Sequence, residues 1–269
     1  MLSDIFSYSF LVRAFITGIL VSITASLIGV SLTLRRFSMI GDGLSHVGFG
    51  ALGVAALLGF SPMAITIPVV VLSAVLLLHF SEKASSGGDS AIALLSSSAL
   101  AIGVIAVSLG GVNTDLNAFL FGSILSVSKS DAILSIALSL ISLLSYTLFY
   151  HQIYITTFDP AFSKATGIRV ERYNLLLSML TAFVVVIGMR ILGSLLISAL
   201  IIFPAMISVK LCKTYKSVTL LSAVEAVAAF IIGFIMSYAV SLPTGASIIV
   251  VHLALYIFTL CFRFIKNRK

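Results

Sequence analysis

Residues 34 to 59 read LRRFSMIGDGLSHVGFGALGVAALLG, in which two arginines precede a long apolar run that contains one aspartate and one histidine. From residue 43 onward the run is long enough to cross the hydrocarbon core of a bilayer, which takes about 17 to 25 helical residues. Ionisable side chains inside a membrane are costly and usually functional. The stretch therefore predicts a membrane helix with a functional polar pair, Asp42 and His46, at its entrance.

The remainder of the chain has the composition of a membrane protein. Hydrophobic residues make up 60% of the 269 residues, charged residues only 9%, and the mean hydropathy is +1.22, values foreign to soluble domains. Apolar runs of span length occur at 14–34, 43–60, 63–80, 90–109, 131–150, 173–189, 191–209, 218–240 and 246–263. We predict an all-α membrane protein, a single transmembrane domain over residues 1–269 that forms a polytopic bundle of eight to nine transmembrane helices.

Two parts of this pattern leave alternatives. The runs 173–189 and 191–209 are separated only by Arg190, so one of them is re-entrant or the two form a tight pair. The apolar run AFLFGSIL at 118–125 is too short to span, and we expect it to be re-entrant or interfacial. The number of spans therefore depends on tertiary packing.

The distribution of charge predicts the orientation. The net charge of +7 does not indicate a nucleic-acid partner, because the basic residues lie at span ends and not along one stripe. With Arg35 and Arg36 in the cytoplasm, alternation places the other basic residues there too, except Arg13, Lys129 and Arg190. We expect a multi-pass protein of the cytoplasmic membrane, in the lipid bilayer, with its amino terminus outside and its carboxyl terminus in the cytoplasm.

Asp42 and His46 are four residues apart, which on a helix places both side chains on one face roughly 6 Å apart. A carboxylate and an imidazole suit a divalent metal ion, but zinc commonly takes four ligands and manganese or ferrous iron takes more. A second copy of the chain across a two-fold axis would supply the same two ligands again. The alternative is that the pair only caps the start of the helix.

The segment FDPAFSKATGIRVER at 158–172 carries the signals of a short cytoplasmic helix. Asp159 is suited to cap its amide groups, Pro160 to its first position and Gly167 to the left-handed conformation beyond its last turn. We expect a stiff helix at the cytoplasmic face, formed by Asp159, Pro160, Ala161, Phe162, Ser163, Lys164, Ala165, Thr166 and Gly167. A partner protein could push against such a helix, whereas an ordered loop without that function is the alternative.

Other polar residues in spans give weaker signals. Glu225 must face the bundle or a partner, where it either assists ion passage or bonds to a neighbouring hydroxyl, and the hydroxyl is favoured. His252 is isolated in the last span and is read as structural. Pro204 is expected to kink the seventh span, which matters for packing or for a gate.

The chain contains no GxxxxGK[ST] phosphate loop, HExxH motif or nucleophile elbow, so ATP hydrolysis is expected on another subunit. Four segments, in order, resemble the integral membrane permeases of ABC transporters for zinc, manganese and iron. They are the opening stretch, FDPAFSKATGIRVERYNLLL at 158–177, MRILGSLLISALIIFPAMIS at 189–208 and SLPTGASIIVV at 241–251. In this family a basic pair precedes a GD-x-x-SH segment.

The resemblance implies a permease that is not itself an enzyme. Its partners are a second copy, cytoplasmic ABC ATPase subunits and an extracytoplasmic metal-binding protein. The resemblance further implies that Asp42 and His46 are intramembrane ligands and that 159–167 couples to the ATPase. We expect no tightly bound cofactor and an imported divalent ion, zinc before manganese or iron. The alternatives are a permease for a metal chelate such as a siderophore, a zinc-dependent membrane enzyme, and a purely structural subunit.

Overall fold

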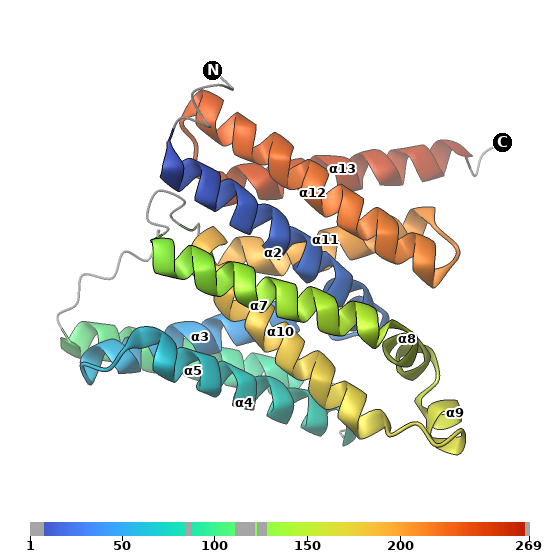
Figure 1. Cartoon of the computed structure of the whole chain (residues 1–269), viewed down its shortest axis with the longest axis horizontal. Helices are drawn as coiled ribbons and strands as arrows, with labels where there is room; N and C mark the ends of the chain where they lie inside the picture. Colours follow the sequence, from blue (N-terminus) through green and yellow to red (C-terminus); the bar gives the residue numbers. More distant parts are fainter. Residues whose placement is uncertain (1–7, 84–87, 111–121, 123–127, 267–269) are drawn as a thin grey trace.

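The computed structural model describes residues 8–83, 88–110, 122 and 128–266, and the described part is built from α-helices. Figure 1 shows long helices packed side by side, with two short helices, α8 and α9, at one end of the bundle. In chain order the helices are α2 (Ser9–Leu34), α3 (Ile40–Leu57), α4 (Pro62–Lys83), α5 (Gly88–Gly110), α7 (Lys129–Leu148), α8 (Tyr150–Phe158), α9 (Pro160–Ala165), α10 (Val170–Leu192), α11 (Ser194–Leu211), α12 (Tyr215–Val240) and α13 (Thr244–Lys266).

Each of the nine predicted spans corresponds to one long helix. In the described part of the chain, eight helices are long and apolar enough to cross a membrane, and α4 contributes a shorter apolar segment, Pro62–Leu78. This confirms the predicted all-α polytopic bundle. The predicted segment AFLFGSIL at 118–125 lies outside the described residues, apart from Gly122.

The sixth and seventh predicted spans form two full helices, α10 and α11, of 23 and 18 residues. The chain reverses between them at Gly193, whose φ of 93° is accessible to glycine and strained for other residues. Arg190, the residue that separates the two predicted runs, belongs to the last turn of α10. The tight pair was therefore the correct alternative, and neither α10 nor α11 is a half-span.

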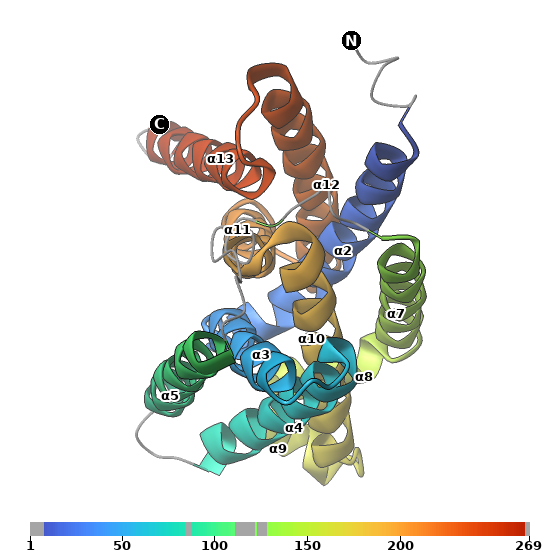
Figure 2. The ribbon, with the colours of Figure 1, turned by 90° about the vertical axis from the view of Figure 1, so that its left-hand side faces the viewer.

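The core of the bundle lies along α2 and α10. In each of these helices 72% of the most apolar window is buried, compared with 17% in α5 and α13. Viewed along the bundle in Figure 2, α2 and α10 lie centrally, while α5, α7 and α13 lie at the periphery. The exposed leucines and isoleucines of these peripheral apolar helices are suited to contact lipid or another apolar helix.

Helices α3 and α5 approach each other especially closely because their contact is made by small residues. A Cβ atom on Gly50 would lie 2.6 Å from the carbonyl oxygen of Ala99, and one on Gly53 would lie 2.8 Å from that of Gly103. No side chain fits at these separations, so the backbones themselves are in contact. This packing fixes the position of α3, the helix that carries Asp42 and His46.

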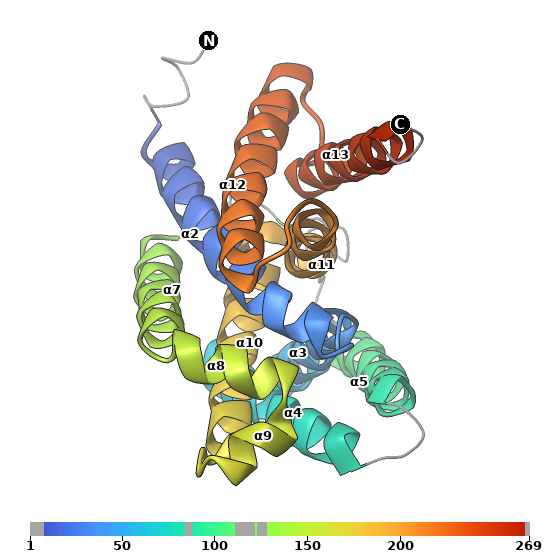
Figure 3. The ribbon, with the colours of Figure 1, turned by 90° about the vertical axis from the view of Figure 1, so that its right-hand side faces the viewer.

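The helix ends form two groups. Figure 1 shows the carboxyl-terminal ends of α2, α7 and α13 on the side of α8 and α9, and the carboxyl-terminal end of α10 on the opposite side. Figure 3, viewed from the α8 and α9 side, shows these short helices beside the start of α10, which both of them contact. This end carries Arg35, Lys164, Lys213 and Arg263, whereas Arg190 lies at the other. The grouping agrees with the charge pattern from which a cytoplasmic α9 end is predicted.

Candidate metal and coupling sites

Asp42 and His46 lie in the first turns of α3. The helix begins at Ile40, two residues before Asp42, and its N-cap residue, Met39, makes no side-chain capping bond. Asp42 is therefore not the capping residue, although a carboxylate in the first turn gains about 0.3 to 1 kcal/mol from the helix dipole. The simple capping alternative does not account for His46.

The two side chains are close but do not satisfy each other. His46 Nε2 lies 3.6 Å from Asp42 Oδ2, which is too long for a good hydrogen bond. The His46 side chain is 20% exposed and that of Asp42 is 35% exposed, and the buried Nδ1 atom of His46 has no hydrogen-bond partner. Both groups therefore keep coordinating atoms for an additional ligand.

The neighbouring glycines identify the surroundings of this pair. A Cβ atom on Gly41 would lie 2.8 Å from Ile201 of α11, and one on Gly43 would lie 2.6 Å from Ile92 of α5. Successive residues of a helix rotate by about 100°, so Asp42 projects between these two contacts. The polar pair thus faces the boundary between α5 and α11.

One chain does not complete a metal shell. Among the described residues, no group of three or more His, Cys, Asp and Glu side chains could hold an ion. Asp42 and His46 supply one carboxylate and one imidazole, fewer than the four or more ligands that a divalent transition metal takes. The pair in one chain therefore lacks the ligands of a complete site.

Residues 159 to 167 form the predicted short helix, with each of its three capping signals in place. The Asp159 carboxylate accepts a hydrogen bond from the amide of Phe162 at 2.8 Å, and Pro160 occupies the first turn of α9. Gly167 has a φ of 82°, and its amide donates to the carbonyl of Lys164. These interactions make α9 a stiff element at one end of the bundle.

Sequence reasoning missed the helix that precedes α9. The fifth predicted span ends at Tyr150, whereas α7 ends at Leu148 and a separate helix, α8, begins at Tyr150 after a break at Phe149. Phe149 has a φ of −101° and a ψ of 19°, and the residues around it are apolar or aromatic. Because the break contains neither glycine nor proline, no breaker signal marked it.

Glu225 and His252 are brought together by α12 and α13. His252 Nδ1 lies 2.9 Å from Glu225 Oε1, and the two side chains are 0% and 7% exposed. The prediction of a hydroxyl partner for Glu225 was wrong, because 27 residues separate it from an imidazole that only helix packing places beside it. Phe203 of α11 stacks on that imidazole with ring centroids 5.9 Å apart.

This buried pair is only partly satisfied. The second carboxylate oxygen of Glu225, Oε2, and the outer ring nitrogen of His252, Nε2, are both buried without a hydrogen-bond partner. Removing one member of a buried charged pair usually costs several kcal/mol, because the other member is left uncompensated. The Glu225 and His252 hydrogen bond therefore links α12 to α13.

Pro204 lies inside α11, and the helix continues through it from Ser194 to Leu211. The residue is buried in the bundle. Its function as a gate stays a prediction.

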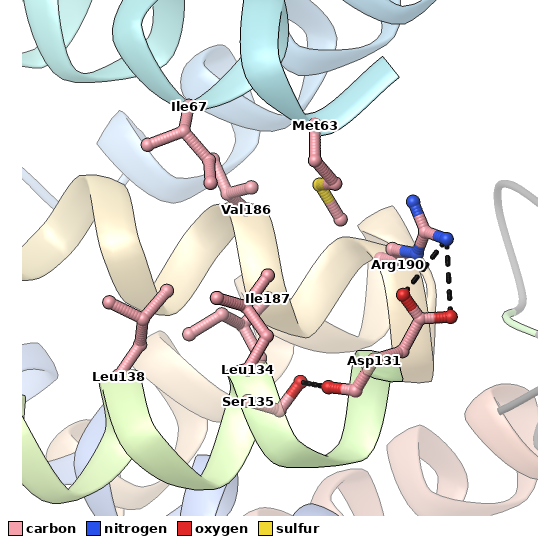
Figure 4. A pocket seen from close by; sticks show the side chains of 9 residues that line it. All are labelled: Met63, Ile67, Asp131, Leu134, Ser135, Leu138, Val186, Ile187 and Arg190. Carbon is pink, nitrogen blue, oxygen red and sulfur yellow. Dashed lines mark hydrogen bonds and ion pairs between the residues drawn. The ribbon is translucent and has the colours of Figure 1, made fainter. Parts of the chain in front are cut away.

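At the opposite end of the bundle from α9, an ion pair joins α7 to α10. Arg190 Nη2 lies 2.9 Å from Asp131 Oδ1 and 3.1 Å from Oδ2. Dashed lines mark both interactions in Figure 4. The adjoining small cavity is otherwise lined largely by apolar side chains of α4, α7 and α10, such as Met63, Leu138 and Val186. The ion pair between Arg190 and Asp131 therefore links α10 to α7.

Comparison with known proteins supports a transporter. The chain matches the model of the ABC 3 transport family over residues 7–263. It is 32% identical over 242 residues to the manganese import system permease protein ScaB of Streptococcus gordonii, covering 90% of this chain and 87% of that protein. It is also 32% identical over 262 residues to the manganese transport system membrane protein MntC of Halalkalibacterium halodurans, covering 97% and 89%.

Solved structures agree with this relationship. PsaBC from Streptococcus pneumoniae, solved in complex with Fab, has a chain that superposes with a TM-score of 0.86 at 29% identity, covering 100% of both chains. An inward-facing putative metal-chelate type ABC transporter has a TM-score of 0.68 at 18% identity, covering 93% and 85%, and shows the fold alone. The curated names describe transport subunits, which confirms the expectation of a transporter permease over an enzyme. The chain belongs to the ABC 3 transport family.

Proposed function

We propose that the chain is the permease subunit of an ATP-driven importer of a divalent transition-metal ion. The observation that carries this proposal is the unsaturated pair at the start of α3, in which His46 and Asp42 lie 3.6 Å apart and keep coordinating atoms free. A carboxylate and an imidazole replace part of the hydration shell that a divalent ion loses on entering the membrane. The curated relatives act in metal import and transport, which supports the same class of cargo.

The proposed transport site is shared by two copies of the chain. Each copy supplies one carboxylate and one imidazole from the boundary between α5 and α11. Two copies supply two of each, which meets the ligand number of zinc and, with water, that of manganese. The homodimer follows from this ligand count, since one chain supplies only two of the groups.

Manganese is the first candidate for the cargo. The names of the relatives support manganese, whereas the nitrogen share of the site favours zinc, which we expected first from the sequence. Both ions are divalent and accept carboxylate and imidazole ligands, and ferrous iron does so as well. Competition between manganese and zinc during transport orders the candidates directly.

The partners follow from the absence of a phosphate loop in this chain and from its family. Cytoplasmic ABC ATPase subunits contact α9, the stiff helix over Pro160–Ala165, and an extracytoplasmic binding protein delivers the ion. The charge pattern supports a cytoplasmic α9 and carboxyl terminus and an external amino terminus in the cell membrane. Closure of the ATPase subunits moves α9 and changes the side of the membrane to which the site opens.

The two rival functions have less support. A permease for a metal chelate has no need of a bare carboxylate and imidazole, because the ion is already coordinated. A zinc-dependent membrane enzyme needs a general base beside the metal, and Glu225 is hydrogen-bonded to His252 on other helices. Both rivals predict that Asp42 is dispensable for the uptake of free metal ions.

The test is manganese uptake by proteoliposomes that hold the complete transporter, with ATP inside and binding protein outside. We expect Asp42→Ala and His46→Ala each to reduce uptake to background while the complex still assembles. His151→Ala is the matched control, since His151 is an exposed histidine on α8. Wild-type uptake in both site variants would overturn the assignment.

A further inference from the structure

Arg35 connects the turn before α3 to both sides of α9. It follows α2 as its C-cap residue and is half-buried. Its guanidinium donates from Nη1 to Asn174 Oδ1 at 2.6 Å, from Nη2 to Thr156 Oγ1 at 3.0 Å and from Nε to Thr157 Oγ1 at 3.3 Å. All three nitrogens are therefore engaged, two with α8 and one with α10.

These acceptors flank the coupling helix. Thr157 precedes Asp159, the N-cap of α9, by two residues, and Thr156 is 1% exposed. Asn174 lies in the first turns of α10, which begins at Val170 beyond the end of α9. A displacement of α9 therefore reaches Arg35 from both directions along the chain. The α2 to α3 turn and α8 lie side by side in Figure 3.

On its other side, Arg35 is linked to the metal ligands through a short, hydrogen-bonded turn. Only residues 35–39 separate α2 from α3. The amide of Phe37 donates to the carbonyl of Leu32 at 2.9 Å, and that of Ile40 donates to Phe37 at 3.2 Å. Asp42 follows within the first turn of α3. A connection with so little slack transmits displacement to Asp42.

We propose that Arg35 is the positioning residue that relays movement of α9 to the Asp42 and His46 site. The proposal rests on the proposed transport function and adds the route of coupling to it. A guanidinium suits this position because its planar fork presents several donors in fixed directions, whereas a lysine ammonium is a single point on a flexible stem. Arg35 itself need not touch the transported ion.

The experiment uses the complete transporter in proteoliposomes and measures three quantities: manganese ions moved per ATP hydrolysed, the ATPase rate and manganese binding without ATP. For Arg35→Gln we expect ions per ATP to fall about ten-fold, because hydrogen bonds of a charged group bias an equilibrium by at least that factor. The ATPase rate and manganese binding should stay within about two-fold of wild type, because a coupling defect affects neither ATP hydrolysis nor ion binding by itself. The number of ions moved per ATP by Arg35→Lys should fall between that of wild type and that of Arg35→Gln.

Arg36→Gln is the matched control, because it removes the same charge at the next residue, which is exposed. Unchanged ions per ATP in Arg35→Gln, or an equal fall in transport, ATPase rate and binding, overturns the relay. If Arg35→Gln does not assemble, the double variant Thr156→Val with Thr157→Val takes its place. A lowered number of ions per ATP in that variant supports the relay, and a normal number overturns it. Asp42→Ala, measured alongside, separates the two failures: normal uptake in that variant refutes the metal site, whereas background uptake there together with a normal ratio in Arg35→Gln refutes the relay alone.

Discussion

Two pairs of the same chemical kind, one carboxylate and one imidazole each, occupy different regions of this protein. Asp42 and His46 are four residues apart on α3, lie 3.6 Å from each other and remain partly exposed. Glu225 and His252 come from α12 and α13, form a 2.9 Å hydrogen bond and are almost completely buried. Residue type alone does not distinguish their functions.

The two pairs differ in access and in how far they satisfy each other, and we propose that this difference separates a binding pair from a structural one. The open pair leaves coordinating atoms for an ion, whereas the buried pair directs its closest atoms at each other beneath Phe203. A buried charge that loses its partner is strongly destabilising, while an exposed one is solvated by water. The two pairs should therefore respond in opposite ways to substitution.

The largest effect is expected from breaking the buried pair. His252→Leu leaves the Glu225 carboxylate without its 2.9 Å partner, and we expect the free energy of unfolding to fall by about 3 to 5 kcal/mol. The double variant Glu225→Leu with His252→Leu should recover most of the loss, since an apolar pair removes the stranded charge. Denaturant titration of the purified protein in mixed micelles measures both. Equal losses in single and double variants would contradict this interpretation.

The open pair should show the reverse, a loss of binding with little loss of stability. Asp42→Asn should weaken manganese binding to the purified complex about 100-fold, roughly 2.7 kcal/mol. It should change the free energy of unfolding by no more than about 1 kcal/mol, the contribution of the helix dipole. Titration with manganese also counts the ions, and we expect one per two chains. An equal affinity loss in the Glu225 and His252 double variant would remove the distinction between the pairs.

A third carboxylate, Asp159, caps the start of α9, whereas Asp42 does not cap α3. Substitution of Asp159 therefore measures the effect of losing a helix cap. Asp159→Ala removes the 2.8 Å bond to the Phe162 amide and should destabilise α9 by about 1 kcal/mol. Amide exchange at residues 160–165 should accelerate about five-fold, and Asp159→Asn, which retains a cap, should not accelerate it. Unchanged exchange in the alanine variant would mean that tertiary contacts alone hold α9.

The smallest effect is expected at the partly exposed ion pair between α7 and α10. The Arg190 side chain is 38% exposed, so Arg190→Gln should cost less than about 1 kcal/mol. The loss should shrink at high salt, because exposed charges are screened, whereas the effect of His252→Leu should not. Thermal unfolding at low and high salt measures both variants. A loss of stability in Arg190→Gln that does not change with salt would mean that this ion pair behaves like the buried pair of Glu225 and His252.

Local signals predicted local structure well. The nine long apolar helices, eight of them long and apolar enough to span in the described part of the chain, the Asp159 cap and the left-handed Gly167 were all readable. Periodicity and capping involve residues within a few positions of each other. The break at Phe149 was not readable, since the turn uses neither glycine nor proline. The contact of Arg35 with α8 and α10 was also missed, because 121 and 139 residues separate it from Thr156 and Asn174.

The sequence by itself determined that this chain is a helical membrane bundle of the metal permease type and that Asp42 and His46 share one helix face. It did so because hydrophobic length and the four-residue spacing are properties of a single helix. Only the tertiary structure decided that Glu225 meets His252, that α10 and α11 are both complete helices, and that one guanidinium joins three segments. Those contacts depend on how helices far apart in the chain pack together, and packing is a property of whole surfaces and not of any one stretch.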